Sequence, residues 1–170
     1  RVGLFAHSGG GFVDTAAICT YPDFYKAAVS SSGNHDNNIY NRGWVEIYNG
    51  VQESTKTIQT ATGKDSIIYT FSSHVPTNME LAKNLKGHLL LVSGDQDRNV
   101  HPAHLLRMAN ALIQANKNFE MLLIPGAKHG YTGQANRFFE KKLWFHFAKY
   151  LLGDFSSEQF TDLDETLKIK

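Results

Sequence analysis

The sequence is poor in cysteine, in net charge and in long apolar runs, and each shortage excludes a class of protein. Cys19 is the single cysteine among 170 residues, so the fold is not an internal disulfide framework. A net charge of +1 argues against electrostatic binding to nucleic acid or to a membrane surface. No run approaches the roughly 18 apolar residues of a membrane span. A globular chain remains, 42% hydrophobic and 19% charged, and its length suits one domain.

Short apolar runs alternate with helical patterns along the chain. The runs are nearly continuous, as expected of strands that are buried on both faces. Strands that alternate with helices predict an α/β fold with a mostly parallel sheet and helices on both faces. The expected strands are 2–6, 27–30, 89–92 and 120–124, and the expected helices are 10–20, one from Pro102 and 135–152. Residues 34–87 are less regular, and we expect a loop at 34–41 and two short helices there.

Three polar motifs each follow a predicted strand. They are His7-Ser8-Gly9-Gly10, Gly94-Asp95-Gln96-Asp97 and Lys128-His129-Gly130. The carboxyl ends of parallel strands meet at one edge of a sheet, where ligands bind. Serine, then acid, then histidine is the order of a catalytic triad in the α/β-hydrolase fold. The sequence therefore predicts nucleophilic catalysis by the serine, with the histidine as its general base.

The segment around Ser8 has the small residues that a nucleophile elbow requires. A sharp strand-to-helix turn tolerates only small neighbours, and Gly10 meets the second glycine position of the motif while Ala6 stands at the first. The N–H of Gly9 would begin the following helix and donate to the oxyanion. We expect His7 to shape the elbow.

Two carboxylates, Asp95 and Asp97, compete for the role of the acid. Its task is to hold the histidine in the correct tautomer and to stabilise the imidazolium. From the residues alone, either could do this, and the other would cap the loop.

No metal site and no cofactor are predicted. His101 and His104 share a helix face, but the sequence offers no evident third ligand for zinc. A calcium loop is excluded because Val100 and Leu106 occupy its glycine and glutamate positions.

The motifs together resemble the prolyl oligopeptidase family of serine peptidases, and above all its dipeptidyl-peptidase IV branch. The likeness rests on His7-Ser8-Gly9-Gly10-Gly11-Phe12, on Gly94-x-x-Asp97-x-Asn99-Val100-His101 and on His129-Gly130. It covers most of residues 2–152. The resemblance implies the last two-thirds of an α/β-hydrolase domain, with the N-terminal strands missing.

The resemblance also implies residue roles. Asp97 rather than Asp95 would be the acid, and Asn99 would hydrogen-bond a substrate carbonyl. Tyr40 and Trp44 match a family pattern whose aromatic side chains line the pocket for proline or alanine, although the family usually has tyrosine where Trp44 stands. The alternative is that both aromatics pack a helix against the core.

The resemblance further implies parts that lie outside this chain. A β-propeller domain would precede the hydrolase domain and hold the amine of a peptide substrate, and a tyrosine upstream would supply the second oxyanion donor. Without that donor we expect the isolated fragment to be weakly active or inactive. A homodimer would cover an open sheet edge. The family context points to a periplasmic, secreted or membrane-anchored catalytic domain.

We therefore expect residues 1–155 to be the C-terminal part of a catalytic domain and 156–170 to be a polar tail. The expected activity is release of N-terminal dipeptides with proline or alanine at the penultimate position, through an acyl-enzyme. Two alternatives stay open: an esterase or other hydrolase of the same fold, and a catalytically silent module kept as a scaffold.

Overall fold

The computed structural model describes residues 1–72 and 75–156, and its internal contacts divide the chain into two units. The first unit contains Arg1–His35 and the chain from Asn78 onward, and the second contains Asp36–Thr77. Most of the predicted tail, residues 157–170, lies outside the described residues. Each unit is described by itself.

The first unit is built on a parallel sheet of four strands. These are β1 (Val2–His7), β2 (Tyr25–Ser31), β5 (His88–Gly94) and β6 (Glu120–Ile124), and they lie in the order β1-β2-β5-β6 with every pair parallel. The four predicted strands and the α/β fold class are confirmed. Parallel pairing places the ends of β1, β5 and β6 along one edge of the sheet, so the loops that follow them lie near one another.

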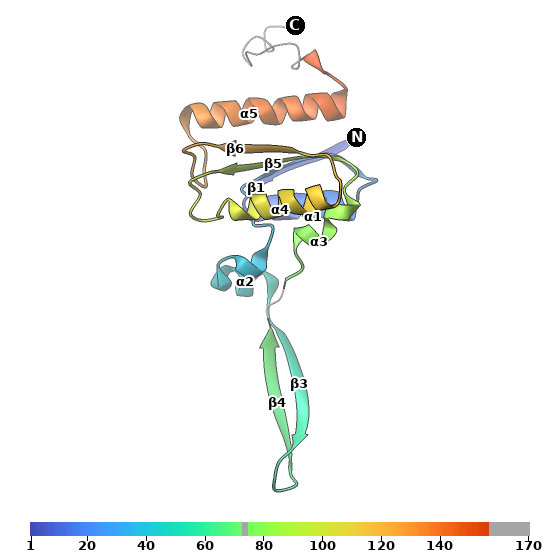
Figure 1. Ribbon diagram of the computed structural model, residues 1–170, viewed down its shortest axis with the longest axis vertical. Coiled ribbons are helices and arrows are strands. Elements are labelled where there is room, and N and C mark those ends of the chain that lie inside the picture. Colours follow the sequence, from blue (N-terminus) through green and yellow to red (C-terminus); the bar gives the residue numbers. More distant parts are fainter. Residues whose placement is uncertain (73–74, 157–170) are drawn as a thin grey trace. The chain divides into compact units, whose positions relative to one another are not determined.

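Helices cover both faces of this sheet (Figure 1). One face carries α1 (Gly9–Thr20) and α4 (Ala103–Gln114), and the other carries α5 (Gly133–Phe147), which continues into the π-helical residues Ala148–Leu152. The short helical segments α3 (Asn78–Leu81) and Ala82–Asn84 precede β5. Among these described helices, none is long and apolar enough to cross a membrane.

The sheet has a hydrophobic core on each face, because successive side chains along its strands point to opposite faces. Ala28, Leu89 and Leu91 belong to a cluster with residues of α1 and α4. Val29, Leu90 and Val92, one position away on the same strands, belong to a second cluster that includes residues of α5. A strand buried on both faces has no polar positions, and this is why these runs are continuous in the sequence.

The second unit corrects the sequence-based expectation. It contains a 3₁₀ turn (Asn37–Ile39), the helix α2 (Arg42–Asn49) and an antiparallel hairpin of β3 (Gln52–Gln59) and β4 (Asp65–Ser72). The loop predicted at 34–41 therefore includes a helical turn, and the hairpin was not predicted. Nearly every side chain of the hairpin is exposed, so neither strand shows the apolar alternation that marks a half-buried strand.

A polar cluster ties α5 and the residues after it to the sheet. Nδ1 of buried His146 lies 3.2 Å from Oε2 of Glu120, and its Nε2 lies 3.2 Å from the carbonyl oxygen of His88. The Tyr150 hydroxyl donates to Oε1 of Glu120 at 2.8 Å. The hydrogen bond from His146, with further help from Tyr150 and Lys149, lowers the pKa of Glu120 to about 2.

This cluster makes a prediction about stability at acid pH. A carboxylate with a depressed pKa stabilises the fold fully above its unfolded pKa of about 4.5, and this stabilisation is lost as the pH falls towards 2. In Glu120→Gln the fall in stability between those values should be shallower than in the parent protein, as measured by urea midpoints from pH 6 to pH 2. Glu140→Gln, an exposed change on α5, is the control and should follow the parent curve. Identical curves for the parent and Glu120→Gln would contradict this.

Candidate active site

Ser8 lies at the sharp turn between β1 and α1. Its backbone adopts φ 60° and ψ −125°, a conformation that non-glycine residues rarely adopt. The Ser8 N–H donates to the Ser31 carbonyl at 2.8 Å, which fixes the turn to the end of β2. A Cβ on Gly10 would lie 2.6 Å from the Cβ of Ala6. Glycine is therefore required at position 10, because the methyl group of Ala6 already fills the space that a side chain on residue 10 would need.

The structure brings the side chains of Ser8, His129 and Asp97 into one hydrogen-bonded line. Nε2 of His129 lies 3.0 Å from Oγ of Ser8, and its Nδ1 lies 2.8 Å from Oδ2 of Asp97. An ionised carboxylate can only accept, so the proton of the neutral imidazole sits on Nδ1. Nε2 is then free to accept the hydroxyl proton of Ser8, which is the arrangement that nucleophilic catalysis by a serine needs.

The two carboxylates that compete in the sequence have different surroundings. The side chain of Asp97 is fully buried, and its Oδ1 accepts from the N–H groups of Asn99 and Val100, each at 2.9 Å. Asp95 is exposed and accepts from the N–H of Gly126 at 2.6 Å. Asp97 thus contacts the histidine, whereas Asp95 ties its own loop to the turn after β6.

Gly94 holds the acid loop and the histidine loop together. A Cβ at this position would lie 2.6 Å from the carbonyl carbon of Ala127 and 2.7 Å from the carbonyl oxygen of Lys128, closer than real Cβ atoms approach. Gly94→Ala should therefore push the two loops apart and destabilise the fold by about 3 kcal/mol. A denaturant titration measures the loss. Gly130→Ala, where a Cβ meets nothing within 4 Å, is the control and should change stability by less than about 1 kcal/mol.

The remaining predicted site residues fall in both units. Gly9 opens α1, so its N–H belongs to the first turn, which has no acceptor within the helix. Asn99 is exposed in the loop directly after Asp97. Tyr40 and Trp44 belong to the second unit, where Trp44 lies in the first turn of α2. Their rings meet edge to face with centroids 5.4 Å apart.

Two residues that the sequence did not single out lie beside the line of Ser8, His129 and Asp97. Ser31 lies at the end of β2. Its Oγ is 2.9 Å from Nδ1 of His7 and donates to the Tyr131 hydroxyl at 3.0 Å. Tyr131 follows His129 by two residues, and its ring packs on Phe139 of α5 with centroids 4.9 Å apart. The placement of Ser31 at a strand end beside β1 is the signal that could have found it.

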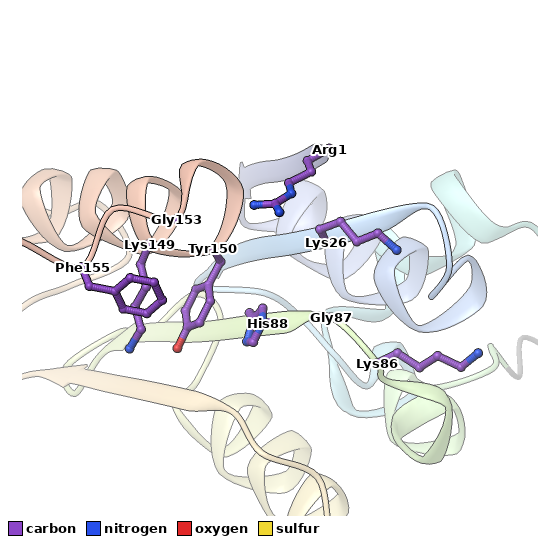
Figure 2. Close-up of a pocket in the computed structure, with 9 residues that line it drawn as sticks. All are labelled: Arg1, Lys26, Lys86, Gly87, His88, Lys149, Tyr150, Gly153 and Phe155. Carbon is purple, nitrogen blue, oxygen red and sulfur yellow. The ribbon is translucent and has the colours of Figure 1, made fainter.

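A separate cavity of about 590 Å³ lies at the other end of the sheet, where β2 and β5 begin (Figure 2). Its lining includes the basic side chains of Arg1, Lys26, Lys86 and Lys149 but no member of the Ser8–His129–Asp97 line. Within residues 1–72 and 75–156, no group of three or more metal-ligating side chains is arranged to hold a metal ion.

Solved structures of two bacterial proteins share this fold. A candidate dipeptidyl aminopeptidase IV from Bacteroides ovatus superposes with a TM-score of 0.72 at 24% identity, over 88% of this chain and 19% of that protein. Dipeptidyl peptidase 4 from Porphyromonas gingivalis superposes with a TM-score of 0.62 at 23% identity, over 86% of this chain and 19% of that protein.

Proteins similar in sequence, like the structural neighbours, are named as peptidases. Prolyl endopeptidase FAP from Bos taurus is 24% identical over 156 residues, and dipeptidyl peptidase 8 from Mus musculus is 27% identical over 129 residues. These matches cover 92% and 76% of this chain but only 19% and 13% of the relatives, so the chain spans less than a fifth of their length. A family model for the prolyl oligopeptidase family matches residues 1–155. The chain carries that match over nearly its whole length, and it therefore belongs to the prolyl oligopeptidase family of serine peptidases.

Proposed function

We propose that this chain is the catalytic portion of a serine exopeptidase that releases N-terminal dipeptides from peptides. The observation that carries the proposal is the line from Ser8 through His129 to buried Asp97 in a member of a serine peptidase family. Activity, substrate and partners belong to the whole protein, of which the relatives suggest this chain is a part.

Acylation begins when Oγ of Ser8 attacks the scissile carbonyl carbon and its proton passes to Nε2 of His129. The negative charge that develops on the carbonyl oxygen is met by the N–H of Gly9 at the start of α1. His129 then gives the proton to the leaving amine, and the C–N bond breaks to leave an ester on Ser8. Asp97 stabilises the transient imidazolium throughout.

Deacylation repeats these steps with water as the nucleophile. His129 takes a proton from water, hydroxide attacks the ester carbon, and the proton returns to Oγ of Ser8 as the dipeptide leaves as an acid. A single base serves both halves because Nε2 faces Oγ at 3.0 Å.

The names of the relatives favour dipeptide release over other kinds of hydrolysis. Dipeptidyl peptidase 8 and dipeptidyl peptidase 4 are named for that activity, although the name of prolyl endopeptidase FAP points to cleavage within chains. The pair Tyr40 and Trp44 would supply an apolar wall for a proline or alanine side chain. The groups that hold the substrate amine, and a β-propeller to carry them, would come from outside this chain.

The proposal is tested on the full-length protein with four substrates and one probe. The substrates are Gly-Pro and Ala-Pro anilides, an N-succinylated Ala-Pro anilide and a nitrophenyl ester, and the probe is a fluorophosphonate mapped by mass spectrometry. We expect labelling at Ser8 and rapid cleavage of the two free-amine anilides, with at least a hundredfold slower cleavage of the blocked one.

Other outcomes identify the alternatives. Equal cleavage of blocked and free anilides would indicate an endopeptidase, and cleavage of the ester alone would indicate an esterase. Full-length protein in which Ser8 never reacts with the probe would indicate a catalytically silent scaffold.

A further inference from the structure

His7 places a second imidazole directly beside His129. The two ring centroids are 4.7 Å apart, and the ring of Tyr131 lies edge-on to His7 at 6.0 Å. Because His7 precedes Ser8, the same turn that exposes the serine fixes the position of this ring. The chemistry proposed for Ser8 gives His7 no step of its own. Any role of His7 in that chemistry must therefore act through its contact with His129.

His7 is anchored by a chain of hydroxyl groups. Its Nδ1 lies 2.9 Å from Oγ of Ser31, Ser31 donates to the Tyr131 hydroxyl at 3.0 Å, and Oγ of Ser32 lies 3.2 Å from that hydroxyl. A hydroxyl donates one proton only. Since Ser31 gives its proton to Tyr131, its oxygen is left to accept from Nδ1–H of His7. One ring proton is thus committed to Ser31, and a second, on Nε2, would make the ring a cation.

Burial, more than the neighbouring charges, disfavours that second proton on His7. Burial and then the nearby imidazole of His129 lower the pKa of His7, while Asp97 and a hydrogen bond with the backbone of His129 act in the opposite direction. The groups that face His7 are therefore His129 and Tyr131 from the loop after β6, Asp97 from the loop after β5, and the Ser31 hydroxyl from β2.

We propose that His7 is a positioning residue for His129, held by Ser31 and Tyr131, and that it must be uncharged for the serine to react. This inference rests on the hydrolase chemistry proposed for Ser8. In that chemistry His129 becomes a cation when it takes the serine proton. A cation already present on His7, with the rings 4.7 Å apart, would oppose this step, and the loss of its anchor would let the His129 ring drift from Oγ of Ser8.

Two ionisations that each stop the reaction leave a distinct pH signature. If only the neutral form of His7 supports turnover, the logarithm of the rate falls with a slope of 1 and then of 2 as the pH is lowered. If the charged form were equally active, the slope would remain 1. One unit below the second ionisation, the two cases differ by about tenfold in rate.

The test measures the rate of fluorophosphonate labelling of Ser8 in the full-length protein between pH 4 and pH 8. This reaction needs His129 but no peptide substrate, and return to pH 7 checks that the protein stays folded. His7→Asn keeps an N–H donor in the place of Nδ1 and cannot become a cation. His7→Phe keeps a ring against His129 but has no donor. His88→Asn changes a histidine outside this site whose pKa is also lowered by burial.

The parent protein and His88→Asn should reach a slope of 2, whereas both His7 variants should stay at 1. At pH 7.5 His7→Asn should react about threefold more slowly than the parent because it loses the ring against His129, and His7→Phe should react at least tenfold more slowly because it loses the donor to Ser31. A slope of 1 in the parent, or equal rates for the two His7 variants, would overturn the role of His7 but leave the function proposed for Ser8 intact. A parent protein that is never labelled would overturn both.

Discussion

Ser8→Ala in the full-length protein is expected to lower kcat by about 10⁶-fold and to abolish labelling by a fluorophosphonate. Loss of the nucleophile in a serine peptidase costs about as much as loss of the whole triad, because the three residues act as a unit. Only binding and the oxyanion donors remain in the variant, and these alone give a small residual rate over water. The measurement is steady-state hydrolysis of a Gly-Pro anilide, with mass spectrometry of the labelled protein.

The control for this substitution is Ser54→Ala, which removes an exposed hydroxyl in β3 that lies 2.6 Å from the Thr70 hydroxyl across the hairpin. Ser54→Ala should retain parent activity and labelling. The urea midpoint of Ser8→Ala should match that of the parent, since among the described residues the Ser8 side chain makes one hydrogen bond, to His129. Labelling that persists in Ser8→Ala would show that another residue is the nucleophile.

The strands that hold the site were predictable because burial requires apolar residues, which the sequence shows as short apolar runs. The inner strands β2 and β5 are buried on both faces and the outer strands β1 and β6 are partly buried, so each appears as a nearly continuous apolar run, and β1, β5 and β6 are each followed by a polar motif. A parallel sheet then requires the three motif-bearing loops to share one edge. The order of the three motifs and their places after predicted strands were therefore enough to bring Ser8 and His129 together with one of two carboxylates in a prediction.

The parts that could not be predicted depend on contacts across the fold or on surfaces with little burial. The β3–β4 hairpin is exposed on both faces, so no periodicity separates it from loop. The contacts of Ser31 and Tyr131 with His7 join residues 24 to 124 positions apart, and each is an ordinary residue in its own segment. The choice of Asp97 over Asp95 came from the family resemblance and not from the residues alone, because both lie just after β5, and in the structure it is Asp97 that contacts His129.

That choice leads to the second large effect, which is expected from Asp97→Asn. The amide keeps the size of the carboxylate, and its oxygen can still accept from the N–H groups of Asn99 and Val100. Its NH₂ group then faces Nδ1 of His129 and donates to it, so the imidazole proton moves to Nε2. In that tautomer Nε2 cannot accept the proton of Ser8, and kcat should fall by about 10⁴-fold with little change in KM.

Asp95→Asn is the matched control because it makes the same chemical change two residues away in the same loop. Asp95 is exposed and accepts a hydrogen bond from the N–H of Gly126, which an amide oxygen can also accept. Its kcat should stay within about threefold of the parent. The same pair of variants separates charge from geometry, since neither changes side-chain volume. A larger loss of kcat in Asp95→Asn than in Asp97→Asn would show that Asp97 is not the acid. Nδ1 of His129 would then need a different hydrogen-bonding partner during the reaction.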